Sequence, residues 1–378
     1  MDLPTKKVSL SQPLDDKQSN QSEEGIQANH AVLTYDVLRI IFQYLGARDL
    51  LTAAKTCRSW RIAARNEADT RRSPEFIFQK FAVDGEPPLP EEYKSERVGR
   101  DLRIKPSFGF AVTKVQEEGE WSPRGCYCSG LPSQCNTIIL GGYEMVVNDS
   151  KISKDLGMAT CLFFPEIAKL SHKLFTVDSH TFKGAADVDM REYSKKILKQ
   201  LLPSKNEKSK CIIMLTNQDG YCFTRHLMDG LQKSYKPGTI SLWGGVCVDL
   251  KVCKASPSSR TCSQNVRCCA ITIASPTLQS WSVVLKRSCR TEAQIEEKLE
   301  TFRNKIQLKK HSLGLMFACC ERIDKKDLEI RIFKKLFPNV QLIGLHGDGE
   351  YGVNTLNEKR EKDLQYGYST IFLILTYQ

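Results

Sequence analysis

Large apolar side chains recur near the start of the chain at the spacing of an amphipathic helix. Leu38, Ile41, Phe42 and Leu45 occupy positions i, i+3, i+4 and i+7, so all four would lie on one face of a helix. Thr34 precedes this run, and its side-chain oxygen could accept a free backbone N–H of the first turn. The pattern therefore predicts a helix that begins just after Thr34 and buries one side.

Two further short amphipathic runs follow. Leu50 and Cys57 belong to the first, whereas Trp60 and Ala64 lie one helical turn apart in the second. Three such helices would form a bundle too small to support a core alone, so we expect the bundle to pack on a partner or on the rest of the chain. The same spacing also fits ordinary packed helices of a larger domain, or a helix-turn-helix that places its basic residues on DNA.

The order of these residues resembles the F-box, by which substrate receptors dock on the Skp adaptor of a cullin-based ubiquitin ligase. The match runs through "LRIIFQYL", "DLL" and "TCRSWR". The family usually begins with Leu-Pro and an acidic residue two positions further on; here Leu33 is followed by Thr34, and Asp36 is the nearest acid. The resemblance implies an adaptor-binding set made of Leu33, Leu38, Ile41, Phe42, Leu45, Leu50, Cys57 and Trp60.

From residue 97 onward, β-like runs alternate with helical runs. Thr291 and Gln294 form a capping-box signal before a helix whose apolar residues extend from Ile295 to Ile306. The runs at 266–274 and 281–286 are separated by a short polar loop, which predicts a hairpin. Helices mixed with such pairs predict an α+β or mixed α/β fold with mixed rather than purely parallel sheets. Further strands are expected at 108–115, 137–147, 158–164, 172–177, 211–215, 240–248, 340–345 and 369–377, and further helices at 188–202, 224–235 and 325–336.

Composition shifts along the chain predict its division into segments. Polar residues dominate the N-terminal segment, several prolines interrupt the stretch after the helices, and Ser, Pro and Lys are frequent in a later segment that looks like an exposed insertion. We therefore expect a disordered tail at 1–29, the F-box at 30–75, a linker at 76–96, the two halves of a large domain at 97–250 and 266–378, and the insertion at 251–265.

This large region resembles the FIST sensor fold, as it occurs behind an F-box in one branch of F-box proteins. The strongest matches are "GLMFACCERI" from Gly314, "LFPNVQLIGLHGDGEYG" from Leu336 and the closing strand from Ser369. Many members read Cys, one residue, then Gly-Arg after the apolar strand, whereas Cys-Cys-Glu-Arg stands here. Since FIST domains are thought to bind small ligands such as amino acids, the resemblance implies a ligand or substrate pocket formed by Cys319, Arg322, His346, Gly347, Gly349 and Glu350.

Several of these residue types could also serve other chemistry. Cys319, His346 and Glu350 are the nucleophile, base and orienting acid of a thiol hydrolase, but their spacing does not show them to be adjacent. The glycines around His346 could admit an anion or simply a tight turn after the preceding strand, and no phosphate-loop template is present. We expect no catalytic residue here.

A metal site is not predicted either. Cys126, Cys128 and Cys135 begin with C-x-C instead of C-x2-C, and no second pair follows nearby. Cys268 and Cys269 are adjacent in a strand-like run, so they would face opposite sides of a sheet. We therefore expect neither a metal nor a cofactor.

Composition narrows the function classes further. Hydrophobic residues make up 41% of the 378 residues and charged residues 26%, which is typical of a globular chain. The formal charge is +11, but no basic stripe studded with aromatics accompanies it, so direct nucleic-acid binding is not expected. The odd number of cysteines, 15, and a polar N-terminus favour a reducing compartment, and no apolar run is long enough to span a membrane.

The sequence thus predicts a non-catalytic substrate receptor of a Skp–cullin–F-box ubiquitin ligase, acting in the cytoplasm and nucleus. Its expected partners are the Skp adaptor, the cullin and RING subunits reached through it, and substrate proteins that are marked for proteasomal degradation. The alternative is a small-ligand sensor of the FIST type without a ligase role.

Overall fold

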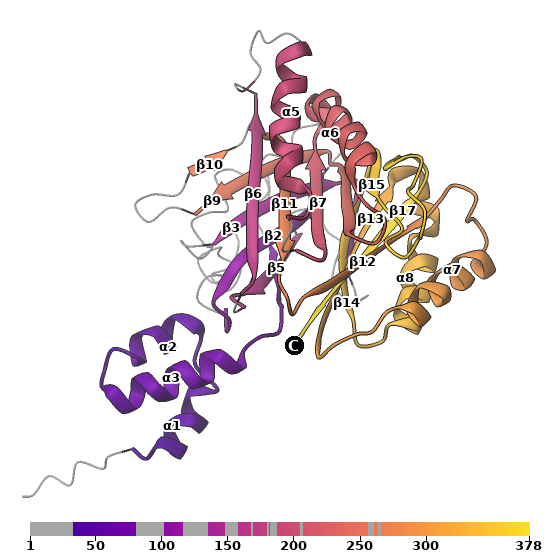
Figure 1. Ribbon diagram of the computed structural model, residues 1–378. Coiled ribbons are helices and arrows are strands. Elements are labelled where there is room, and N and C mark those ends of the chain that lie inside the picture. The colour runs from indigo at the N-terminus through magenta and orange to yellow at the C-terminus, as the bar shows by residue number, and fades with distance from the viewer. Residues whose placement is uncertain are drawn as a thin grey trace, which may run out of the picture.

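The computed structural model describes residues 33–80, 102–115, 135–147, 158–167, 169–179, 181, 187–204, 207–255, 261–263 and 266–378. A three-helix unit projects from a large domain built of mixed β-sheets and helices (Figure 1). The unit contains α1 (Tyr35–Phe42), α2 (Ala47–Ala53) and α3 (Arg58–Thr70). The predicted tail at 1–29 lies outside the described residues.

The three-helix unit has a small core of its own. Leu38, Phe42 and Leu50 are buried there against alanines of α3. The Phe42 ring meets the Trp60 ring edge-on, with 5.4 Å between the centroids. Thr34 stands at the predicted helix start, but its side chain makes no capping hydrogen bond. Packing of apolar side chains, rather than a cap, therefore orders α1.

The described strands of the large domain form three sheets. The first sheet has the order β1 (Glu75–Lys80), β5 (Met158–Pro165), β2 (Pro106–Lys114), β3 (Asn136–Gly142), β9 (Asp249–Lys254) and β10 (Thr261–Ser263). The second has the order β16 (Gln365–Tyr366), β15 (Glu350–Gly352), β8 (Ile240–Val246), β7 (Lys210–Thr216), β11 (Val266–Ala274) and β6 (Ser171–Asp178). The third has the order β12 (Gln279–Leu285), β17 (Thr370–Tyr377), β13 (His311–Cys319), β14 (Gln341–Gly347) and β4 (Glu144–Val147).

The three sheets share one plan. Among the described strands, each sheet contains one parallel pair, namely β2 with β3, β7 with β8, and β13 with β14. The other pairings are antiparallel, as between β1 and β5 or β13 and β17. The expectation of mixed sheets is therefore confirmed.

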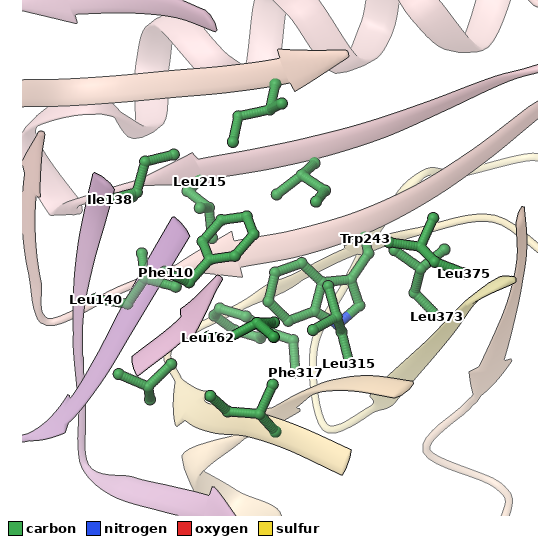
Figure 2. Packing of buried hydrophobic residues seen from close by; sticks show 14 of the residues in the cluster. Phe110, Ile138, Leu140, Leu162, Leu215, Trp243, Leu315, Phe317, Leu373 and Leu375 are labelled. Carbon is green, nitrogen blue, oxygen red and sulfur yellow. The ribbon is translucent and has the colours of Figure 1, made fainter. Parts of the chain in front are cut away.

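The inner faces of all three sheets meet in one core. Phe110 of the first sheet, Leu215 of the second and Leu315 of the third belong to the same buried cluster (Figure 2). Trp243 and Phe317 join the second sheet to the third, with ring centroids 5.9 Å apart in an edge-to-face arrangement. Burial of so many large side chains is the main stabilising term for the domain.

Helices cover the outer faces of two sheets (Figure 1). Apolar residues of α5 (Asp187–Leu201) and α6 (Tyr221–Ser234) pack on the second sheet. Those of α7 (Glu292–Lys305) and α8 (Lys326–Leu336) pack on the third. Short 3-10 turns, η4 (Gln218–Gly220) and η5 (Cys320–Lys325), precede α6 and α8. In the described helices, no segment has the length and apolar character needed to cross a membrane.

Local predictions of helices in this domain are accurate. The capping box of α7 is present: Thr291 Oγ1 accepts from Gln294 N at 3.3 Å, and Thr291 N donates to Gln294 Oε1 at 3.1 Å.

The prediction for the adjacent cysteines of β11 is confirmed as well. Cys268 and Cys269 belong to different buried clusters on opposite faces of the sheet, as strand alternation predicts.

Two predictions for the strands of this domain were wrong, the second of them in part. The runs at 266–274 and 281–286 do not form a hairpin, because β11 pairs with β6 and β7 while β12 pairs with β17 of another sheet. The start of the proposed exposed insertion at 251–265 is strand β9, which pairs with β3. Val252 and Cys253 are buried there, and Cys253 is disulfide-bonded.

The predicted linker at 76–96 also begins differently. Its first residues belong to β1, which pairs with β5 along its whole length from Glu75 to Lys80. Only residues up to 80 of that segment are described. The chain therefore passes directly from the three-helix unit into the first sheet, because residues 71–74 alone connect the end of α3 at Thr70 to the start of β1 at Glu75.

Candidate functional site

The outer surface of the three-helix unit carries a row of exposed apolar side chains. Val37, Ile40, Ile41 and Tyr44 are 40%, 59%, 40% and 83% exposed, and their spacing of three, one and three residues places them on one side of α1 and its following turn. Leu51 of α2 and Ile62 of α3 are exposed as well. Because α1 is apolar on both sides, one side fills the core and the other remains available to a partner.

The predicted adaptor-binding residues fall into two groups. Leu38, Phe42 and Leu50 are buried within the unit, and Leu45 and Trp60 are half-buried against them. Leu33, Ile41 and Cys57 are exposed. Adaptor contact by these residues stays a prediction, and the buried ones line the interior of the unit in this structure.

Sequence reasoning missed Val37, Ile40, Leu51 and Ile62 as surface candidates. It assigned a single apolar face to α1, whereas the run "VLRIIF" supplies two. The signal for a second face was the number of apolar residues in the run, which exceeds what one stripe needs.

Arg71, just beyond α3, holds the unit to the large domain. Its side chain is only 7% exposed and ion-pairs with Glu67, with 2.8 Å between Nε and Oε1. Its other nitrogens donate to the carbonyls of Phe42 at 2.7 Å, Leu45 at 2.7 Å and Arg103 at 2.8 Å. One guanidinium thus ties the end of α1 to the end of α3 and to the chain that enters β2.

Further polar contacts cross the same junction. Arg103 Nη2 donates to Gln43 O at 2.6 Å, and Ala47 N donates to the backbone oxygen of Leu102 at 2.7 Å. The C-terminal strand takes part as well, because Tyr377 Oη donates to Arg72 O at 2.7 Å. The three-helix unit is therefore attached through hydrogen bonds as well as through β1.

The predicted pocket at the C-terminal ends of β13 and β14 contains a buried ionic network. Arg322 of η5 forms an ion pair with Glu329 of α8, and both side chains are buried. Arg322 also donates to Thr370 Oγ1 at 3.1 Å and to Cys289 O at 3.1 Å. Burial raises the pKa of Glu329, while Arg322 opposes that rise. The groups satisfy one another, so Arg322 serves to connect η5, α8 and β17.

Cys319 and Glu350 lie near each other between the third and second sheets. Burial, and secondarily the charge of Glu350, raises the pKa of Cys319 to about 12. Burial raises the pKa of Glu350 to about 7, although its Oε2 accepts from Ser369 N at 3.1 Å and from Ser369 Oγ at 2.6 Å. Its Oε1 has no hydrogen-bond partner among the described residues. A thiol held protonated in this way is a poor nucleophile.

His346 does not complete a triad with them. In β13 and β14, Phe317 and Leu345 face the central core, so the following residues Ala318 and His346 face α7 and α8. Cys319 therefore lies on the other side of the sheet from His346. Burial lowers the pKa of His346 to about 4, which keeps the ring neutral, and neither ring nitrogen has a partner among the described residues.

The glycines of the turn after β14 serve close backbone packing. A Cβ at Gly347 would lie 2.2 Å from the Val246 carbonyl oxygen, and Val246 N donates to Gly349 O at 2.8 Å. The backbone N–H of Asp348 is occupied by Val246 O at 2.9 Å. The turn thus joins β14 to β8, and its amide at Asp348 is not available to an anion.

Open hollows in the described part of the chain lie at other places. One of about 620 Å3 lies between α5 and α6, and one of about 440 Å3 lies beside the start of α7, near Cys289. Of the cysteines weighed as zinc ligands, Cys126 and Cys128 lie outside the described residues. The described residues contain no group of three His, Cys, Asp or Glu that could hold a metal ion.

Comparison with known proteins agrees with the N-terminal geometry. Residues 35–73, which span the three helices, match the F-box-like family. The chain is 29% identical over 113 residues to F-box only protein 22 of Pongo abelii, and 28% identical over 113 residues to F-box only protein 22 of Homo sapiens. Each match covers 26% of this chain and spans 28% of the relative's length. These matches support an F-box protein.

Among solved structures, a cyanuric acid hydrolase from A. caulinodans covers 81% of this chain and 99% of its own, with 8% identity and a TM-score of 0.39. That likeness is too distant to assign a shared fold or activity. The resemblance of the large domain to the FIST fold stays a prediction.

Proposed function

We propose that this protein is the substrate-recognition subunit of a Skp–cullin–F-box E3 ubiquitin ligase. The observation that carries the proposal is the F-box-like three-helix unit, whose α1 and following turn expose Val37, Ile40, Ile41 and Tyr44. Such an apolar row on a small helical unit fits a partner surface that would bury it. The Skp adaptor is that partner, and it links the chain to the cullin and RING subunits.

The large domain then recruits substrate proteins for ubiquitination and proteasomal degradation. Its contribution to catalysis is proximity, since it raises the local concentration of substrate lysines near the activated ubiquitin. No side chain of this protein has to react, which agrees with a Cys319 thiol whose pKa is raised to about 12. We place this activity in the cytoplasm and nucleus.

Co-expression of the full chain with the Skp adaptor tests the proposal. The informative variant is Ile40→Asp/Ile41→Asp, because both side chains are exposed and their replacement should leave the core of the unit intact. We expect the adaptor to elute with the wild type and to be lost from the variant, with an affinity loss of about a hundredfold or more, since two buried unpaired charges cost several kcal/mol. Phe42 is unsuitable for this test, because an aspartate in its buried position would unfold the unit.

The matched control is Leu308→Asp/Ile323→Asp, which changes two exposed apolar residues of the large domain in the same way. It should keep the adaptor. Adaptor co-elution that survives in a folded Ile40→Asp/Ile41→Asp protein would show that α1 is not the docking surface.

A further inference from the structure

A groove runs between two helices on the outer face of the second sheet. Helices α5 and α6 lie side by side there and border the hollow of about 620 Å3. They run parallel, because Tyr193 lies beside Phe223 and Leu198 lies beside Gly230 further along both helices. A Cβ at Gly230 would be 2.9 Å from Leu198 Cδ2, so glycine permits the close approach that forms the floor of the groove.

The walls of this groove are positively charged. Arg191 and Lys195 lie one turn apart on α5, and Arg225 and Lys233 lie two turns apart on α6; all four are exposed. Asp229 is the one carboxylate among the described lining residues. Within the described part of the chain, no carboxylate forms an ion pair with Arg191, Arg225 or Lys233. Four cations against one carboxylate leave a positive potential in a concave surface, which attracts an anionic partner.

The dimensions of the groove fit a short extended peptide. Lining residues on α6 extend from Cys222 to Lys233, which corresponds to about 16 Å along a helix. An extended chain advances about 3.3 Å per residue, so about five residues would fill the groove. Lys195 also pairs with Glu192, but both are exposed, and an exposed pair of this kind exchanges readily.

The lining residues favour an acidic peptide over a nucleic acid. Single-stranded nucleic acids are held by large aromatic side chains on which bases stack, and the described lining residues include no Phe, Tyr or Trp. Asp229 interrupts the row of cations on α6, which opposes a continuous phosphate backbone but suits a peptide in which acidic and neutral residues alternate.

The groove also lies far from the three-helix unit. In Figure 1, α5 and α6 are at the upper end of the molecule and α1, α2 and α3 at the lower left, so both surfaces can be occupied together. We propose that the groove between α5 and α6 is the site where the large domain holds an acidic, extended segment of a substrate protein. The binding follows from the groove itself, and its role in selecting substrates rests on the function proposed above.

Fluorescence anisotropy on the full chain in complex with the Skp adaptor tests this inference. The probe is a fluorescein-labelled peptide of alternating Glu and Ser, about twelve residues long, which exceeds the length of the groove. The variant Arg191→Glu/Arg225→Glu reverses one charge on each wall. We expect it to bind the probe at least about tenfold more weakly, because two attractive contacts become repulsive.

The control Lys305→Glu/Lys310→Glu makes the same change in net charge on exposed residues outside the groove and should bind within about twofold of wild type. Equal weakening of both variants would show that only net charge matters and would overturn the inference. A second result would also overturn it. If a single-stranded DNA of equal length bound more tightly than the peptide probe, and the groove variant lost that binding, the occupant would be a nucleic acid.

Thermal unfolding of each variant checks its fold. If the charge reversal unfolds the protein, Arg191→Gln/Arg225→Gln replaces it as the test, and we expect this variant to lose less affinity for the probe than a folded charge-reversal variant would. Adaptor co-elution is scored separately from probe binding. An adaptor complex that does not bind the probe would overturn the groove and leave the ligase proposal intact. Probe binding by a chain that never retains the adaptor would support the groove and contradict the ligase role.

Discussion

Two buried ionisable side chains, Glu350 and His346, respond to pH in opposite ways. Burial raises the pKa of Glu350 from 4.5 to about 7, so the native state holds a proton that the unfolded state has released between those pH values. Burial lowers the pKa of His346 from 6.5 to about 4, so the unfolded state takes up a proton that the native state does not hold. The contribution of neutral Glu350 to the free energy of unfolding is lost as pH rises toward 7. The contribution of neutral His346 is lost as pH falls toward 4.

Glu350→Gln should separate these effects. The amide stays neutral and can still accept from Ser369, so the variant should gain stability relative to wild type as pH rises from 5 to 8. Between pH 5 and pH 8 the raised pKa of Glu350 corresponds to a gain of about 2 to 3 kcal/mol, or several degrees in Tm. Thermal unfolding at both pH values measures it, with the exposed Glu358→Gln as the control. A difference in Tm that does not change with pH would show that Glu350 is ionised in the native state throughout this range.

At the level of elements, one arginine makes several of the hydrogen bonds at the junction after α3. Arg71 donates to the carbonyls of Phe42 and Leu45 at the end of α1, and it does so from a position close to the start of β1. The neighbouring Arg72 has an exposed side chain, and its one hydrogen bond to another described residue goes to Asp69 O at 3.0 Å. The two adjacent arginines therefore form a matched pair for experiment.

Arg71→Met should destabilise the three-helix unit by about 1 to 3 kcal/mol, because the carbonyls of Phe42 and Leu45 each lose a charged hydrogen-bond donor. Hydrogen–deuterium exchange should become faster in α1 and α3 and remain unchanged in β13, at the centre of the third sheet. Arg72→Met should exchange like the wild type. Equal protection of α1 in both variants would mean that Arg71 does not hold the junction.

The pairing errors at this level have a physical cause. The helices α5, α6, α7 and α8 could be placed from local periodicity and capping, since these depend on residues close in sequence. The partners of β11 and β12 depend on strands far away in the chain, such as β6 and β17. The short polar loop between β11 and β12 indicated a hairpin. Packing in the central core instead places β11 in the second sheet and β12 in the third.

At the level of the whole molecule, the orientation of the three-helix unit is set by β1 and by its hydrogen bonds to the large domain. Ser73 Oγ lies 3.0 Å from His311 Nδ1, and Tyr377 Oη donates to Arg72 O at 2.7 Å, so residues from the far end of the chain define the junction. For a substrate receptor, such a junction would fix the distance between the adaptor and the bound substrate.

Inserting about ten Gly and Ser residues between Ser73 and Pro74 of the Arg71→Met chain should release the unit, since such a segment has an end-to-end distance of about 17 Å. We expect small-angle scattering to show a larger radius of gyration, while the adaptor still elutes with the protein. The control carries the same segment in the Arg71→Met chain between Ser275 and Pro276, in the loop before β12, so that the added mass is equal. An equal radius in both proteins would indicate that the insertion does not release the three-helix unit.

The sequence by itself determined the order of the F-box-like helices, most helices of the large domain and the mixed character of its sheets, because these follow from local periodicity and residue order. Only the tertiary structure decided that Phe42 points into the three-helix unit while Ile41 faces outward. It also decided that Cys319 and His346 lie on opposite sides of one sheet. Such choices depend on which distant segments pack together, and that information is spread over the whole chain rather than held in any one motif.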